Sequence, residues 1–138
     1  MTAVFADTFY WIAVTNARDS AHEEAKRLSR SLASVTLVTT EPVLIEYLNY
    51  FAAWGSELRG IASANANTML SNPSVRVLPL TARSLRAGID LYAARLDKGY
   101  SLTDCISMAA MRDEGLTGVL THDRHFEQEG FLPLLRAD

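Results

Sequence analysis

Acidic side chains stand at two places where a short apolar segment stops. Asp7 follows the run 3–6, and Asp123 comes shortly after the run 118–121. Short apolar runs bounded in this way predict buried strands, and ligands of parallel α/β sheets bind beyond the carboxyl ends of the strands. Aspartate is also a favoured helix-capping residue, so each acid alone has a structural interpretation. Two such acids in one sheet favour a functional site.

Glu46 is the only charged residue in the segment 42–55. Apolar neighbours nearly encircle it on the expected helix, which predicts a helix buried on most sides. A buried carboxylate is costly unless it is paired or binds a metal. The alternative is an exposed edge on which Glu46 and Asn49 form one polar stripe.

Asp104 stands three residues after Ser101. This is the spacing of a capping box, in which an acid near the start of a helix also interacts favourably with the helix dipole. Helix capping alone therefore explains Asp104. A catalytic role is indicated only because the other acids are also present.

Together these acids suit one kind of reaction. Hard oxygen ligands select Mg²⁺ or Mn²⁺, and such an ion can activate water and neutralise charge on a phosphoryl group during in-line displacement. Carboxylates held close together also need a counter-ion. We therefore predict a Mg²⁺ site, with Mn²⁺ as the alternative ion, formed by Asp7, Glu46, Asp104 and Asp123.

The segments that carry these acids alternate between strand and helix. We expect strands at 3–6, 35–38, 75–80 and 118–121, a fifth at 131–135, and helices at 8–14, 19–32, 40–54, 57–70, 81–96, 101–114 and 123–129. This alternation predicts a parallel sheet covered on both faces. No linker-like stretch divides the chain, so we predict one three-layer α/β/α domain over residues 1–138, with a central parallel sheet of four to five strands.

Composition limits the kinds of partner. Of the 138 residues, 49% are hydrophobic, and the net charge of −3 counts against a broad basic surface for nucleic acid. Contacts with phosphates would have to come from bound metal and from local arginines. The candidates are Arg83, Arg86, Arg95 and Arg112, with salt-bridged surface arginines as the alternative.

Several features favour a cytoplasmic protein. The single cysteine, Cys105, allows no intramolecular disulfide and is expected to be a buried helix residue. The N-terminus has no basic start and reaches Asp7 too soon for a signal peptide. The most apolar stretch, 42–55, is too short to span a bilayer.

Four short motifs, in order along the chain, resemble the PIN-domain family, especially the toxin ribonucleases of VapBC toxin–antitoxin pairs. The matching segments are Val4-Phe5-Ala6-Asp7-Thr8, the helix of Glu46, Ser101-Leu102-Thr103-Asp104-Cys105 and Thr121-His122-Asp123-Arg124-His125-Phe126. The resemblance covers essentially the whole chain. Phe9 departs from it, since many relatives have a small polar residue there, and this bears on how open that side of the site is.

The resemblance implies a PIN-like fold and a Mg²⁺-dependent endoribonuclease whose metal site is the four acids already named. It also implies that Thr8, Thr103 and Thr121 support this site through hydrogen bonds. Members of the family cleave RNA, usually as homodimers, and a VapB-type antitoxin often inhibits them. A homodimer would agree with the surplus of aromatic residues at Tyr47, Tyr50 and Trp54.

Two other functions remain as alternatives. A haloacid-dehalogenase-like phosphatase needs a second aspartate two residues after the first, and Phe9 occupies that position. A catalytically silent PIN-like module that binds RNA or protein need not retain four acids. Metal binding by the histidines that flank Asp123, His122 and His125, is disfavoured, because His22 is the only other histidine in the sequence. Approach to the substrate phosphate is the alternative for either ring.

Overall fold

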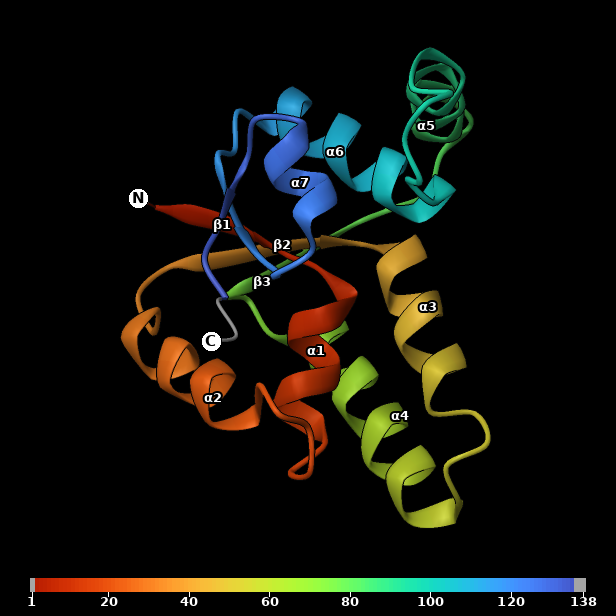
Figure 1. The fold of residues 1–138 in the computed structure, drawn as a ribbon. Helices are drawn as coiled ribbons and strands as arrows, with labels where there is room; N and C mark the ends of the chain where they lie inside the picture. The colour runs from red at the N-terminus through yellow and green to blue at the C-terminus, as the bar shows by residue number, and fades with distance from the viewer. Residues whose placement is uncertain (1, 136–138) are drawn as a thin grey trace.

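A five-stranded parallel sheet forms the centre of the molecule in a computed structural model that describes residues 2–135 (Figure 1). The strand order is β3-β2-β1-β4-β5, and each neighbouring pair is parallel. Their bounds are β1 (Ala3–Ala6), β2 (Thr36–Thr40), β3 (Val75–Leu78), β4 (Gly118–Leu120) and β5 (Leu132–Pro133). Because β1 lies between β2 and β4 and the three strands are parallel, their carboxyl ends meet at one edge of the sheet.

Helices cover both faces of this sheet. In Figure 1, α1, α2 and α4 lie on one side, α6 and α7 lie on the other, and α3 begins where β2 ends. The helices are α1 (Thr8–Thr15), α2 (His22–Ser31), α3 (Glu41–Tyr50), α4 (Ser56–Ser71), α5 (Ala82–Ala94), α6 (Leu102–Glu114) and α7 (Arg124–Gln128). The predicted three-layer α/β/α fold and parallel sheet are confirmed.

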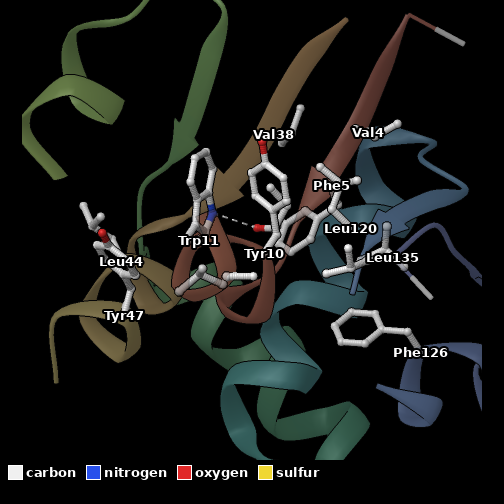
Figure 2. Close-up of a cluster of buried hydrophobic side chains, with 14 of the residues drawn as sticks. Val4, Phe5, Tyr10, Trp11, Val38, Leu44, Tyr47, Leu120, Phe126 and Leu135 are labelled. Carbon is white, nitrogen blue, oxygen red and sulfur yellow. Dashed lines mark hydrogen bonds between the residues drawn. The ribbon is translucent and has the colours of Figure 1, made fainter. Parts of the chain in front are cut away.

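The core is built on both faces of the central strands (Figure 2). Phe5, Val38 and Leu120 on these strands are at most 1% exposed. Trp11 packs beside them, and its indole N–H donates to the carbonyl oxygen of Ala6 at 3.2 Å. This bond satisfies a buried donor. It also holds α1 directly beneath the end of β1, where Asp7 lies.

Some predicted boundaries were wrong for local reasons. The helix expected to run to residue 54 ends at Tyr50, and Gly55, with φ +94°, precedes α4 instead of closing α3. The helix expected from Asp19 begins at His22, because the Asp19 carboxylate accepts from the Ala21 N–H and forms a separate turn first. Pro133 lacks an N–H and belongs to an edge strand of two residues, shorter than the predicted 131–135.

Helix α5 lies on the outside of α6. Gly88 allows the close contact, since a Cβ there would come within 2.4 Å of Ile106 Cγ1. Four apolar residues at helical spacing, three on α5 and one just after it, are 37–85% exposed and do not enter the core; they are Leu85, Ile89, Tyr92 and Leu96. No helix in the described part of the chain is long and apolar enough to cross a membrane.

Candidate active site

A pocket of about 340 Å³ opens at the edge where β1, β2 and β4 end. We call it the acid pocket. All four predicted acids line it, together with side chains from α1, α3 and the start of α6. The lining residues are Asp7, Thr8, Phe9, Ile12, Glu46, Tyr50, Ser101, Asp104 and Asp123. The structure therefore brings the four carboxylates together from four distant parts of the chain.

Asp7 is the most buried of the four, with 5% of its surface exposed. It occupies the N-cap position of α1, but its side chain makes no capping hydrogen bond. The Thr121 hydroxyl instead donates to Asp7 Oδ2 at 3.0 Å. Burial, with the nearby charges of Asp104 and Glu46, raises the pKa of Asp7 to about 7. The site thus contains a carboxylate that is costly to ionise without a cation.

Glu46 lies opposite Asp7 on α3. Its Oε1 accepts a hydrogen bond of 2.5 Å from the Thr8 hydroxyl. The next residues along α3 partly support the alternative of a polar edge, since Ile45 is 54% exposed and Asn49 is also exposed. Glu46 is half-buried and points into the acid pocket from that edge. The prediction of a helix buried on most sides was therefore too strong.

Asp104 and Asp123 combine capping with a place in the pocket. The Ser101 N–H donates to Asp104 Oδ2 at 3.2 Å, and the Asp104 N–H donates to the Ser101 hydroxyl, which completes the predicted capping box. Asp123 caps α7 by accepting from the His125 N–H at 2.9 Å. Capping leaves further lone pairs on both carboxylates. Burial and the charge of Asp123 raise the pKa of Asp104, against the lowering effect of the Ser101 and His125 hydrogen bonds.

The donor set fits a divalent cation. The residues that line the acid pocket include four carboxylates and neither lysine nor arginine. Four acids with neither lysine nor arginine among them raise each other's cost of ionisation, and a doubly charged cation offsets that cost. Oxygen donors of this kind suit Mg²⁺ or Mn²⁺.

The other predicted residues divide into two groups. Thr8 and Thr121 make the hydrogen bonds to Glu46 and Asp7 described above. Thr103 lies beside Asp104 at the start of α6, and no hydrogen bond of its hydroxyl is recorded in the part of the chain that the structure describes. Two of the predicted supports are therefore in contact with acids, and the role of Thr103 stays a prediction.

Two of the arginines considered for phosphate binding are engaged elsewhere. Arg95 and Arg112 both bind the carboxylate of Glu129, which is 4% exposed and also accepts from the Tyr100 hydroxyl at 3.1 Å. Hydrogen bonding to Arg95, opposed by burial and aided by Arg112 and Tyr100, lowers the pKa of Glu129 to about 2. The alternative interpretation, salt-bridged arginines, is correct for this pair.

His125 is the site residue that the sequence analysis undervalued. Its Nδ1 lies 3.4 Å from Asp104 Oδ2 and 3.4 Å from Asp123 Oδ1. The signal was present in the spacing, because a capping aspartate places the residue two positions later beside its own carboxylate. Tyr50 was considered only for an interaction surface, yet it also lines the acid pocket. His122 instead packs against Phe9, with ring centroids 3.6 Å apart.

A larger hollow of about 880 Å³ lies elsewhere, between α5, α6 and the end of β3. Its acids, Asp90, Asp113 and Glu114, are spread along two helices and do not converge with a histidine or with one another as metal donors within the described residues. The smaller acid pocket is the one that the four predicted carboxylates line together.

Comparison with known proteins extends these observations. The family model described as the PIN domain matches residues 4–132. The 23S rRNA-specific endonuclease VapC20 of Mycobacterium tuberculosis is 30% identical over 129 residues, which cover 94% of this chain and 95% of that protein.

Solved structures show the same fold. The crystal structure of M. tuberculosis VapC20, described as a Sarcin-Ricin loop cleaving toxin, superposes with a TM-score of 0.86 and 28% identity over 96% of this chain and 99% of that chain. VapBC2 from Rickettsia felis, bound to a DNA fragment from its promoter, gives a TM-score of 0.65 at 12% identity, covering 95% of this chain and 96% of that one. FitAcB from Neisseria gonorrhoeae gives 0.64 at 17% identity, covering 96% of each chain.

Proposed function

The chain belongs to the PIN-domain family, and from this premise we propose that it is a divalent-metal-dependent endoribonuclease, the toxin of a type II toxin–antitoxin pair. The family model and the similarity to VapC20 confirm the resemblance to the PIN-domain family inferred from four short motifs. The observation that carries the proposal is the convergence of Asp7, Glu46, Asp104 and Asp123 in one pocket at the carboxyl edge of the sheet.

Each side chain has a part in this proposal. Asp7, Asp104 and Asp123 would hold the cation, with Glu46 completing the negative wall of the pocket. When bound, Mg²⁺ or Mn²⁺ supplies activation of water and neutralisation of charge on the scissile phosphate. Thr121 and Thr8 keep the Asp7 and Glu46 carboxylates oriented through their hydrogen bonds. Such fixed positions reduce the reorganisation needed during reaction.

The relative VapC20 indicates a class of substrate. VapC20 is named for cleavage of 23S rRNA and of the Sarcin-Ricin loop. We propose that this chain also cleaves an exposed rRNA loop. With a net charge of −3, the protein has no excess of basic side chains with which to hold a long duplex, so a compact loop that brings one phosphate to the metal is the fitting target.

The proposal includes partners and location. A VapB-type antitoxin would inhibit the enzyme, and the active form would be a homodimer in the cytoplasm, where ribosomes are found. The predicted dimer surface needs revision, because Tyr47 is 1% exposed and cannot contribute, whereas Tyr50 and Trp54 are 40% and 46% exposed. The exposed stripe of α5, Leu85, Ile89 and Tyr92, is a second apolar surface that could bind another copy of the chain.

The direct test is cleavage in vitro of an RNA panel: a Sarcin-Ricin loop fragment of 23S rRNA, other rRNA fragments and several tRNAs. Each is incubated with Mg²⁺, with Mn²⁺ or with excess EDTA. We expect cleavage of a loop RNA only with metal, leaving 5′-phosphate and 3′-hydroxyl ends. Cleavage that persists in EDTA, or 2′,3′-cyclic phosphate ends, contradicts the mechanism. RNA binding without cleavage in all conditions would instead indicate the silent binding module.

A further inference from the structure

The imidazole of His125 completes a compact set of metal donors. The Asp123 carboxylate accepts from the His125 N–H at 2.9 Å, which folds the chain so that the ring turns back over the acids. Nδ1 then lies 3.4 Å from one oxygen of Asp123 and 3.4 Å from one oxygen of Asp104. The ring nitrogen that faces the acids is thus equidistant from both.

This set is tighter than the set of four acids. Within residues 2–135, Asp104, Asp123 and His125 form the one group of three or more metal-binding side chains whose donor atoms all lie within 4.8 Å of one another. Donors bonded to one first-row metal ion at about 2.1 Å stand ~3.0 Å apart in octahedral sites and ~3.4 Å apart in tetrahedral ones. The separations of Nδ1 from the two oxygens fall within reach of that range.

The surroundings hold the ring in this position. The Tyr100 ring packs against the imidazole, with centroids 5.1 Å apart and planes inclined at 57°. The hydroxyl of Tyr100 is fixed in turn by Glu129, which Arg95 and Arg112 bind. The His125 side chain is 31% exposed, so water reaches part of the ring. The Nε2–H tautomer leaves Nδ1 free to bind metal.

We propose that His125 Nδ1 is a ligand of the cation held by Asp104 and Asp123, so that this site prefers first-row transition-metal ions such as Mn²⁺ over Mg²⁺. Imidazole is a softer donor than carboxylate and contributes more to the binding of transition metals than of Mg²⁺. This inference deepens the proposed function by identifying the class of metal. It concerns binding and can be measured without RNA.

Pulsed EPR on the Mn²⁺-loaded protein tests the ligand directly. We expect electron spin-echo modulation from a directly bound nitrogen, which changes frequency when the protein is made with ¹⁵N-histidine. The modulation should vanish in His125→Asn, in which a polar atom remains near the position of Nδ1 but the imidazole is gone. It should persist in His22→Asn, where the ring bonds instead to the Ala13 carbonyl oxygen, and in His122→Asn. The isotope effect in the unmutated protein is informative even if a variant folds poorly.

Calorimetric titration gives a second readout. His125→Asn should weaken Mn²⁺ binding by at least ~10-fold while changing Mg²⁺ binding much less, so the Mn²⁺ preference narrows. The proposal is overturned if the unmutated protein shows no nitrogen coupling from histidine, or if His125→Asn weakens the binding of Mn²⁺ and of Mg²⁺ equally. His125 would then be a positioning residue. RNA cleavage without nitrogen coupling would keep the proposed function and reject this inference. Nitrogen coupling in a protein that cleaves no RNA would do the reverse.

Discussion

The Thr121 hydroxyl donates a 3.0 Å hydrogen bond to Asp7 Oδ2, joining residues 114 positions apart in the sequence. Each lies just beyond the end of one of two adjacent strands, β4 and β1. The Asp7 side chain makes no capping bond to its own helix, so the hydrogen bond from Thr121 orients its carboxylate. The buried acid is thus held for a role at the pocket rather than for the stability of α1.

We expect Asp7→Asn to lower metal-dependent cleavage by about 10³-fold or more, equivalent to about 4 kcal/mol, because the amide keeps the shape and the Thr121 contact but loses the charge that holds the cation. Asp104→Asn should behave alike. Single-turnover cleavage rates with circular dichroism of each variant provide the measurement. Asp97→Asn is the matched control, since Asp97 is 76% exposed and lies outside the acid pocket. Normal rates in both site variants would reduce these acids to structural residues.

The metal-free protein should lose stability as the pH rises from about 4 to about 8. The folded-state pKa of Asp7 is raised to about 7, so its contribution is fully present below the unfolded value of ~4 and is lost as the pH rises through the folded value. Thermal melts in EDTA across this range should show a falling melting temperature. Asp7→Asn should flatten the dependence and melt several degrees higher than the parent at pH 8.

Mg²⁺ or Mn²⁺ should reverse this trend in the parent, since an ion that binds only the folded site stabilises by mass action. The rise should be much smaller in Asp7→Asn. A parent protein whose melting temperature is unaffected by either ion at pH 8 would speak against a cation site in the acid pocket.

Glu129 should contribute to the free energy of unfolding through its ion pairs with Arg95 and Arg112. Glu129→Gln leaves two arginines without their shared carboxylate and should cost about 1–3 kcal/mol, measured by denaturant unfolding at pH 7, because Arg95 and Arg112 are 35% and 48% exposed and water screens part of the loss. Because the folded pKa is lowered to about 2, the stabilisation is present above the unfolded value and disappears as the pH falls through 2. Glu127→Gln, at an exposed position of α7 two residues before Glu129, should change stability by less than about 0.5 kcal/mol.

Two glycine substitutions should have opposite effects. Gly88→Ala places a Cβ 2.4 Å from Ile106 Cγ1 and 3.2 Å from its backbone, so overpacking should cost about 1–3 kcal/mol despite the better helix propensity of alanine. Gly60→Ala, inside α4 with open space around it, should stabilise by about 0.5–1 kcal/mol. Chemical denaturation of the two variants beside the parent measures the difference. Equal effects would mean that α5 and α6 can separate freely.

The proposed dimer should depend on α5. Ile89→Asp puts a charge in the exposed stripe and should convert particles of about 30 kDa into monomers of the 15.2 kDa chain, as measured by light scattering at micromolar concentration. Leu70→Asp changes an equally apolar residue on α4, 59% exposed, and should leave the dimer intact. Monomers in the parent protein would contradict the homodimer, and dimers that survive Ile89→Asp would move the interface elsewhere.

The sequence predicted the sheet and the acids because both depend on local patterns. Apolar runs that stop at Asp7 and shortly before Asp123 identified strand ends, and all parallel strands of one sheet end at the same edge. The capping box of Ser101 and Asp104 was also readable from spacing alone. Capping and a place in the site are alternatives when judged from the sequence. In the structure, Asp104 and Asp123 each cap a helix and also line the acid pocket.

Features that depend on distant partners could not be predicted. Glu129 looks like an ordinary surface acid until α5 and α6 bring Arg95 and Arg112 against it. The apolar stripe of α5 has the periodicity of a core helix, but periodicity does not say whether a partner covers it. For His125 the spacing indicates the contact with Asp123, but the approach to Asp104, 21 residues earlier, depends on the tertiary fold.

The central position of β1 sets the order in which the acid pocket can form during translation. β1 can pair with β2 as soon as residue 40 has been made, but its other neighbour, β4, arrives only with residues 118–120, and Asp123 comes later still. At 5–20 residues per second, this interval is roughly 4–16 s. A ribosome that synthesises this chain therefore carries an incomplete acid pocket until β4 and Asp123 have emerged, and the nascent protein cannot assemble the full pocket before then.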